Sequence, residues 1–439
     1  MNMKIKQLCL LAIAFATYNS LTAQDNAKGY YKDLFIDGGI KLTSSSNLPS
    51  ARYLGLSVEA FTSSSHKSNG KSAYNMIDTL RQHQVFGGSP IDENGVLLFP
   101  DGSPRFRMIY VNGGGAASHG RSLGEEGRAR IREYIRNGGS YIGSCAGAFV
   151  ASRAVKGDSA LKYTDAYIGI WPGLTISTGI HNSQTRLNLD NDSPLLKYYD
   201  FGNRGYVDSV YHNGGGYGVT DTDWPKGTEI LARYDIQGRT DLKLKRNIQD
   251  FPAIWGQKAD EHSGRVIMCG SHPEFVRTGE KLELMCAMVR YALDGNGTPK
   301  LKGTLKNGEE RKMYCFTHDN NPDFTAIGDK QYHHFALNVP KDTKKVTLTL
   351  KPKAGYANFD LFLLAHPQKY AYLGEAKYKN MGTGSEKTLV INQPNAGTLY
   401  LSVLCNTTVE TINTPYGTEY TGRVDVLNGV PYSITATIE

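Results

Sequence analysis

The sequence predicts an α/β domain with a mostly parallel sheet flanked by helices, followed by an all-β sandwich domain. Three observations predict this order. Apolar, strand-like runs alternate with helical patterns up to about residue 295. The stretch from Asp294 to Lys300 is rich in Gly, Asn and Pro and is typical of a linker. Beyond it, apolar residues recur with a period of two, and no helical period intervenes.

The first elements of the α/β region follow from local patterns. Leu34 to Ile36 and Phe106 to Val111 predict short strands, the second of which ends at a Gly triplet. Leu123 to Asn137 predicts a helix, because apolar residues recur there at four-residue spacing. Gly138-Gly139 supplies its stop.

The remaining elements of this region surround the chemistry. Tyr141-Ile142 predicts a strand that runs into a sharp turn, and Val266 to Met268 predicts a late strand. Lys281 to Leu293 predicts a closing helix with one apolar face. Because active-site groups in parallel α/β folds lie at the carboxyl ends of strands, we expect the chemistry just after the two strands.

The C-terminal region predicts an antiparallel sandwich. Four runs alternate apolar and polar residues, and turn residues separate them: Phe335 to Val339, Val346 to Leu350, Leu399 to Val403, and Tyr432 to Ile438. We therefore expect a β-sandwich over residues 300–439 after an α/β domain over residues 24–296.

The N-terminus predicts a signal peptide over residues 1–23. Lys4 and Lys6 precede the short apolar run Leu8 to Ala16, and Leu21-Thr22-Ala23 is a plausible cleavage site. This run is too short to span a bilayer, and no later stretch is long and apolar enough. We expect an exported protein, periplasmic or extracellular, with no membrane span.

Composition excludes several functional classes. Hydrophobic residues make up 40% of the 439 positions and charged residues 21%, as in ordinary globular proteins. The net charge is +7, and removal of the two lysines of the signal peptide lowers it to 47 minus 42, or +5. The basic residues are scattered, so no nucleic-acid partner is expected. Outside the signal peptide, Cys315 and Cys405 either pair as a disulfide or remain two buried thiols.

Cys145 has the context of a catalytic nucleophile. It lies in Gly143-Ser144-Cys145-Ala146-Gly147, between a strand and a start of small residues typical of a helix. A nucleophile on such a turn needs small neighbours, because the backbone is strained and the next element packs closely. A helix N-terminus and an adjacent imidazole both favour a thiolate. A buried structural cysteine is the alternative.

A base and its orienting carboxylate occur far downstream. His272 and Glu274 lie in Ser271-His272-Pro273-Glu274, directly after the late strand. His272 would accept a proton from the cysteine, and Glu274 would fix its tautomer. The alternative for each is an inert loop residue.

Other polar groups are weaker candidates. The backbone amide of Ala146, with that of Gly114 or Gly115, would stabilise an oxyanion, although a plain tight turn explains the triplet equally well. The run Gly214-Gly215-Gly216 predicts a flexible loop. Three histidines are possible pocket residues, but each is better explained as a histidine on the surface or in the core: His119, His181 and His212. The acidic residues around His318 favour a solvated turn over a Ca²⁺ loop, so no metal and no cofactor is expected.

These motifs together resemble the class I glutamine amidotransferase-like superfamily, and within it the biotin-protein-ligase N-terminal-like group. The matching segments are Ile109 to Gly115, Asn137 to Ala148, Tyr211 to Gly216 and Ser271 to Glu274, within a resemblance over roughly residues 30 to 295. Many members of the superfamily have proline before the glycine pair, where this chain has Asn112. The C-terminal region resembles the bacterial pre-peptidase C-terminal domain, which implies a jelly-roll fold. Its matching segments are Phe335 to Pro340, Asn358 to Leu363 and Pro394 to Tyr400.

The residues and the resemblance imply a cysteine-dependent hydrolase or amidohydrolase. Cys145 would attack an amide or peptide carbonyl of a small-molecule, peptide or cell-wall substrate and form a thioester. The sequence contains no P-loop motif and no biotin-type ligase site, so hydrolysis is favoured over ammonia transfer. The alternative is a non-catalytic ligand-binding protein that uses the same pocket.

Overall fold

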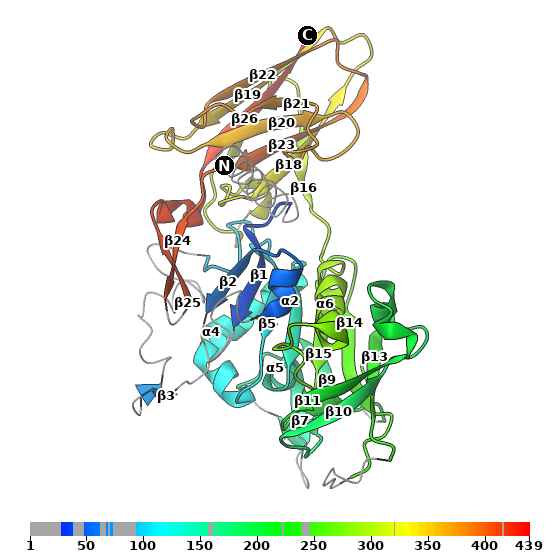
Figure 1. Cartoon of the computed structure of the whole chain (residues 1–439). Coiled ribbons are helices and arrows are strands. Elements are labelled where there is room, and N and C mark those ends of the chain that lie inside the picture. Colours follow the sequence, from blue (N-terminus) through cyan, green and yellow to red (C-terminus); the bar gives the residue numbers. More distant parts are fainter. Residues whose placement is uncertain are drawn as a thin grey trace, which may run out of the picture.

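The structure is a computed structural model. It describes residues 28–37, 48–61, 67–68, 71–72, 94–156, 161–163, 165–221, 224–238, 246–319, 321–414 and 417–439. The expected signal peptide lies outside these residues. Among the described helices, none combines the length and apolar character that a membrane crossing requires. Figure 1 shows an α/β part and, at one end of it, a second part built of strands.

One large mixed sheet organises the α/β part. Its eleven strands, in spatial order, are β11 (Tyr206–His212), β10 (Ser183–Asn188), β13 (Thr228–Asp235), β14 (Pro252–Lys258), β15 (Arg265–Cys269), β6 (Ser140–Ser144), β5 (Phe106–Val111), β1 (Lys32–Asp37), β2 (Val58–Phe61), β25 (Gly417–Thr421) and β24 (Glu410–Thr414). The five central strands, from β15 to β2, pair in parallel. The strands outside them pair antiparallel.

The expectation of a mostly parallel sheet is therefore wrong for the sheet as a whole and correct for its centre. The four antiparallel strands β11, β10, β13 and β14 come from residues 183–258. Short connections join several of them, and such connections permit antiparallel pairing without a crossover helix.

Helices cover both faces of the central strands, as the sequence predicts. On one face, Ile131 of α4 (Ala116–Arg136) and Val150 of α5 (Ala146–Ala151) share a buried cluster with Ile109 and Tyr141. On the other face, α2 (Pro49–Tyr53) and α6 (Gly279–Leu293) share a second cluster with strand residues such as Met108 and Ile142. Neighbouring positions along each strand thus point to opposite faces.

The predicted helix over 123–137 is part of a longer element. The helix α4 begins seven residues earlier, at Ala116, and is interrupted at Gly124, whose φ of 65° and ψ of 178° are not helical. Glycine adopts such a conformation without a Cβ clash, which explains why the helical pattern starts next to it.

A smaller four-stranded sheet packs beside the main one: β12 (Gly216–Gly218), β9 (Trp171–Ser177), β7 (Ser152–Lys156) and β8 (Leu161–Tyr163).

The C-terminal part consists of two sheets that share a buried core. The first contains β16 (Leu301–Leu305), β18 (Tyr332–Val339), β23 (Gly397–Cys405), β20 (Leu361–His366) and β21 (Tyr378–Asn380). The second contains β17 (Glu310–Met313), β26 (Tyr432–Ile438), β19 (Lys345–Pro352) and β22 (Lys387–Asn392). The four runs predicted from period-two patterning are the strands β18, β19, β23 and β26. Minor elements are the short hairpin β3 (Lys67–Ser68) and β4 (Lys71–Ser72), with four 3₁₀ turns at 194–197, 201–203, 322–324 and 424–428.

Contacts between the two parts are extensive, although the composition of the linker is typical of a boundary between separate domains. The hairpin β24–β25 leaves the C-terminal part and extends the large sheet beside β2 (Figure 1). A buried ion pair joins Arg105 Nη2 to Asp329 Oδ2 at 2.9 Å, and Arg105 also donates to Tyr420. One hydrophobic cluster runs from α4 into both C-terminal sheets.

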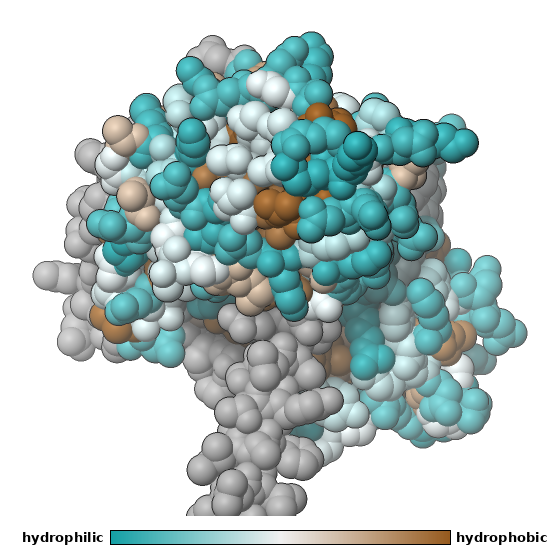
Figure 2. Space-filling view, turned by 90° about the horizontal axis from the view of Figure 1, so that it is seen from above, coloured by the Kyte–Doolittle hydropathy of each residue, from teal (hydrophilic) through white to brown (hydrophobic). Residues whose placement is uncertain are grey.

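The outer surface of the C-terminal part is mostly polar. Figure 2, viewed from above, shows a largely hydrophilic surface with small, separated hydrophobic spots. Single exposed apolar side chains of this kind are ordinary on the surfaces of folded proteins.

Candidate active site

The turn that carries Cys145 has the geometry of a nucleophile elbow. Cys145 lies between β6 and α5 with φ of 49° and ψ of −104°, a conformation that non-glycine residues rarely adopt. Hydrogen bonds hold the turn on both sides. The Cys145 amide donates to the Cys269 carbonyl at 2.8 Å, and the Cys145 carbonyl accepts from Ala148 at 3.0 Å and from Phe149 at 3.1 Å. Strained backbone that its surroundings hold in this way is typical of functional sites.

Small residues beside the elbow are required by close packing. A Cβ added to Gly143 would lie 2.4 Å from the Gly147 carbonyl carbon, and one added to Gly147 would lie 2.1 Å from the Val111 carbonyl oxygen. Neither position tolerates a side chain, because both neighbours are backbone. The glycines that predicted the turn are thus explained by the approach of α5 to β5 and β6.

The fold brings His272 to the elbow. Strands β15 and β6 are parallel neighbours, with Cys269 opposite Ser144, so the two loops leave the same edge of the sheet. A Cβ added to Gly113 would lie 2.4 Å from His272 Cε1 and 3.5 Å from Cys145 Cβ. Both side chains therefore border the same glycine.

Glu274 lies against the other side of the histidine ring. His272 Nδ1 and Glu274 Oε1 are 2.8 Å apart, and the His272 amide donates to the Tyr211 carbonyl at 2.8 Å. Glu274 is 1% exposed, and its second oxygen, Oε2, has no hydrogen-bond partner among the described residues. A buried carboxylate in this position fixes the ring orientation and leaves Nε2 to face the sulfur.

The electrostatic environment favours the charged histidine. Burial alone would lower the pKa of His272. The interactions with the Cys145 side chain and with the Glu274 carboxylate outweigh that effect and raise the pKa to about 10. His272 thus holds a proton at neutral pH, as a group that protonates a leaving amine must.

The expected oxyanion donors lie on either side of the elbow. Ala146 is the first residue of α5, where the amides of the first turn have no partner inside the helix. Gly114 has a φ of +150° and Gly115 precedes α4, so both follow β5 at the same edge of the sheet. Gly113 borders the site as well and was not among the predicted site residues, although the apolar run that ends at Val111 points to the loop that contains it.

The segment from Tyr211 to Gly216 is packed against the site, so the interpretation of Gly214-Gly215-Gly216 within it as a flexible loop is wrong. The Asn213 carbonyl oxygen lies 3.6 Å from Cys145 Sγ, which makes it an acceptor for the thiol. A Cβ on Gly215 would lie 1.7 Å from the Gly270 carbonyl oxygen. The exposed Tyr211 ring lies 5.7 Å from the His272 ring and forms a wall beside it.

The other candidate histidines have structural positions. His212 is buried, with Nε2 2.7 Å from Thr178 Oγ1 and Nδ1 3.0 Å from Ser271 Oγ. Burial and the nearby His272 lower its pKa to about 3, so it is neutral and supports the loop from below. His119 is buried beside Gly114, and His181 is exposed near Gly214.

Among the described residues, the remaining thiols and the acidic side chains around His318 form neither a disulfide nor a metal site. All five described cysteines are free, so Cys315 and Cys405 do not form the disulfide that the sequence left open. His318 Nε2 pairs with Glu133 Oε1 at 2.6 Å. Within the described ranges, no three metal-binding side chains cluster.

The fold and the elbow define an α/β domain with a candidate cysteine nucleophile at the carboxyl ends of parallel strands. Residues 63–312 match the family described as biotin-protein ligase, N terminal. The match covers more than half of the 439 residues, so this chain belongs to that family. The resemblance found in the sequence is thereby confirmed, and the match extends past the linker into the first C-terminal strands.

Two proteins and one solved structure show how distant the relatives are. An uncharacterized protein of Chlamydia muridarum is 24% identical over 208 residues, which are 45% of this chain and 73% of that protein. A biotin–protein ligase of Schizosaccharomyces pombe is 21% identical over 257 residues, which are 54% of this chain and only 37% of the ligase. A glutamine amidotransferase crystal structure has 17% identity and a TM-score of 0.30, covering 43% of this chain and 79% of its own. The family assignment rests on none of these weak likenesses.

Proposed function

We propose that this protein is an exported cysteine-dependent hydrolase that cleaves an amide or peptide bond. The observation that carries the proposal is the convergence of the strained Cys145 elbow with the His272–Glu274 pair. A cysteine that only filled the core would need neither a positive φ nor an adjacent protonated imidazole.

The geometry supports a sequence of four steps. Cys145 Sγ attacks the substrate carbonyl carbon, and the carbonyl oxygen becomes an oxyanion. The backbone amides of Ala146 and Gly114 or Gly115 stabilise that oxyanion. His272 donates its proton to the leaving amine, the carbon–nitrogen bond breaks and a thioester remains. Water then attacks the thioester, His272 accepts the water proton, and the acid is released with the thiolate restored.

The orientation of His272 supports this assignment. Its Nδ1 faces Glu274, so the other ring nitrogen is left to exchange a proton with sulfur or substrate. The buried carboxylate stabilises the imidazolium without itself accepting the proton. No step requires a cofactor.

The proposal extends to location and architecture. The charged and apolar pattern of residues 1–23 supports export. The two C-terminal sheets with their shared core support a jelly-roll accessory module, which we propose acts in attachment or substrate localisation.

The competing function is ligand binding without catalysis at the same pocket. Reactivity of the thiols distinguishes the two. Cys315 is the most exposed of the five described cysteines, whereas Cys145 is buried, with only 6% of its surface exposed. If accessibility alone governed alkylation, iodoacetamide would modify Cys315 first.

We expect the opposite order: Cys145 is alkylated at least about tenfold faster than Cys315 at pH 7, because a neighbouring imidazolium stabilises the thiolate. Mass spectrometry of tryptic peptides measures both rates in one sample. Cys145→Ala abolishes the fast phase and any turnover on an amide or peptide panel with little change in melting temperature, and Cys315→Ala is the matched control. Equal rates at the two cysteines, or full turnover in Cys145→Ala, would refute the proposal.

A further inference from the structure

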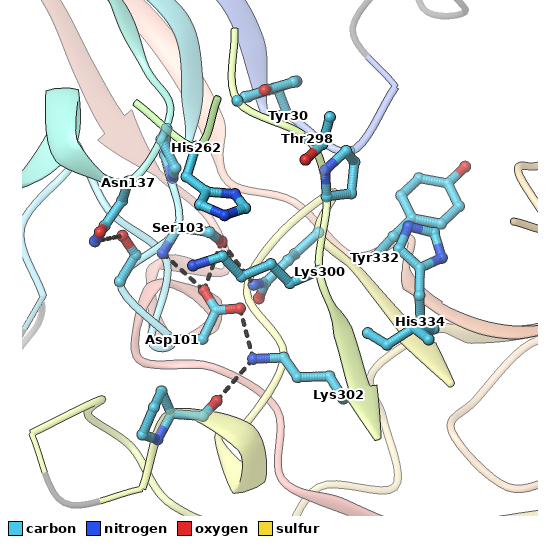
Figure 3. A pocket seen from close by; sticks show the side chains of 18 of the residues that line it. Tyr30, Asp101, Ser103, Asn137, His262, Thr298, Lys300, Lys302, Tyr332 and His334 are labelled. Atoms are coloured by element: carbon cyan, nitrogen blue, oxygen red, sulfur yellow. Dashed lines mark hydrogen bonds and ion pairs between the residues drawn. The ribbon is translucent and has the colours of Figure 1, made fainter. Parts of the chain in front are cut away.

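A cavity of about 410 Å³ lies where the α/β part meets the C-terminal sheets (Figure 3). Its walls come from both parts: the loop before β5, the end of α4, the linker and strands β16 and β18. Cys145, His272 and Glu274 are not among its lining residues. Its volume falls within the range of small-molecule sites, so it has room for a ligand of its own.

The floor of the cavity is a rigid polar network. Ser103 Oγ donates to Asp101 Oδ1 at 2.5 Å, and Gln331 Nε2 donates to Ser103 Oγ at 3.2 Å. Lys302 Nζ lies 2.7 Å from Asp101 Oδ2 and neutralises it. Burial raises the pKa of Asp101, but the Lys302 ammonium more than compensates and holds it below its usual range. Donors and acceptors therefore keep fixed positions before any ligand arrives.

Lys300 supplies a positive charge at the mouth of this cavity. The linker that leads to Lys300 is held on the α/β part, because the Gly297 amide donates to the Gly138 carbonyl at 2.9 Å and Asn296 Nδ2 donates to the same carbonyl at 3.2 Å. Figure 3 shows its side chain extending in the direction of His262 and Ser103. Within the described part of the chain, no carboxylate forms an ion pair with Lys300, whereas Lys302 and Lys28 each have one.

A wall of stacked rings completes the cavity on the C-terminal side. The rings of Tyr332 and His334 are stacked at 5.8 Å with an angle of 16°, and Tyr372 meets both edge-on. Burial lowers the pKa of His334 to about 3, so this ring is neutral. It also stacks on Tyr370, with ring centroids 4.4 Å apart, so it supports the Tyr332 ring from behind and leaves Tyr332 as the aromatic surface of this wall. Leu373 N donates to the Tyr332 hydroxyl at 3.2 Å, which holds that ring in place.

These groups together define a ligand chemistry. A rigid set of hydroxyl, amide and carboxylate groups matches the hydroxyls of a sugar, and an aromatic face matches the apolar side of a sugar ring. A lysine without an ion-pair partner adds selectivity for an anionic group. The amide of Asn137 already donates one hydrogen to the Gly102 carbonyl at 2.7 Å and retains a second hydrogen for a ligand.

We propose that this junction cavity is a second binding site, separate from the Cys145 site, for a sugar that carries a carboxylate. Lys300 binds the carboxylate, and the network at Ser103 with Asn137 binds the hydroxyls. Because both parts of the chain line the cavity, the bound sugar also stabilises their junction.

Isothermal titration calorimetry on the full chain tests the proposal with three probes: D-glucuronate, D-glucose and acetate. For a ligand of this size we expect glucuronate to bind with a dissociation constant of about 1 mM or below. Glucose, which has the ring without the charge, and acetate, which has the charge without the ring, bind at least about tenfold more weakly. N-acetylmuramate in a fourth titration distinguishes a cell-wall sugar from a uronic acid as the better ligand.

Three lysine variants test the role of Lys300: one that removes its charge, one that keeps the charge, and one control outside the cavity. Lys300→Met weakens glucuronate binding about tenfold or more and leaves the melting temperature of the free protein unchanged, because Lys300 is exposed. Lys300→Arg retains most of the binding. Lys341→Met, at an exposed turn outside the cavity, has no effect. Absence of glucuronate binding, equal binding of glucose or acetate, or unchanged binding in Lys300→Met would each overturn the proposal.

Discussion

Replacement of Glu274 by Gln separates the charge of the carboxylate from its shape. The Glu274 oxygen lies 2.8 Å from His272 Nδ1, and together with Cys145 it raises the pKa of His272 to about 10. An opposite charge at this range shifts a pKa by about 1–3 units. We therefore expect the pKa of His272 in Glu274→Gln to fall by about 1–3 units towards the ordinary value of about 6.5.

The sign follows from linkage. A histidine whose pKa is raised by folding stabilises the folded protein fully below its unfolded pKa, and this contribution is lost as pH rises through about 10. In Glu274→Gln that loss, and the alkaline fall in turnover, both move to lower pH.

Proton NMR of the His272 imidazole measures its pKa directly and needs no known substrate. The resonance is assigned because it is absent from the spectrum of His272→Gln. Glu261→Gln is the matched control, because the Glu261 side chain is 84% exposed and pairs with the neighbouring His262 instead of His272. An unchanged pKa of His272 in Glu274→Gln would show that the carboxylate does not tune the base.

Two further predictions follow from packing. In Gly113→Ala the new Cβ would lie 2.4 Å from the His272 imidazole, so the ring must move and we expect turnover to fall about 100-fold. Gly382→Ala is the control: its new Cβ would make only an ordinary contact at 3.6 Å, so turnover stays unchanged. Wild-type turnover in the first variant would contradict the placement of the ring. Asp329→Asn leaves the buried Arg105 without its counter-charge and lowers the free energy of unfolding by about 3–5 kcal/mol, measured by urea denaturation. Asp425 forms an exposed ion pair with Arg423, so Asp425→Asn should change the free energy of unfolding by less than about 1 kcal/mol. Equal losses of stability in the two variants would refute the argument.

Local sequence patterns predicted the elements that position the site. The apolar run before Cys145, the glycines around it and the His-Pro-Glu segment identified β6, the elbow and the loop after β15. These features are local, because strand periodicity, turn chemistry and close backbone approach leave their signal within a few residues.

The missed features depend on contacts between distant residues. The pairing of Phe61 with Gly417 joins segments more than 350 positions apart, and no periodicity encodes such a partner. Gly113 was overlooked because its role, to leave space for His272, appears only when β5 and β15 lie in one sheet. Asn213 contributes through its carbonyl, which every residue type has, so its identity carries no signal.

The C-terminal part is a structural component of the α/β part as well as an addition to it. Its hairpin covers the edge of β2, which would otherwise expose unpaired backbone groups. Its Asp329 neutralises Arg105, a buried charge that the α/β part cannot satisfy with a carboxylate of its own among the described residues. The family match likewise continues to residue 312, beyond the linker. Arg105 directly precedes β5, and Gly113 lies in the loop that follows it. A loss of the C-terminal contacts would therefore disturb Arg105 at one end of β5 and, through the strand, the candidate active site at the other. We therefore expect the linker to connect two parts that fold as one unit, although its composition suggests two independent domains.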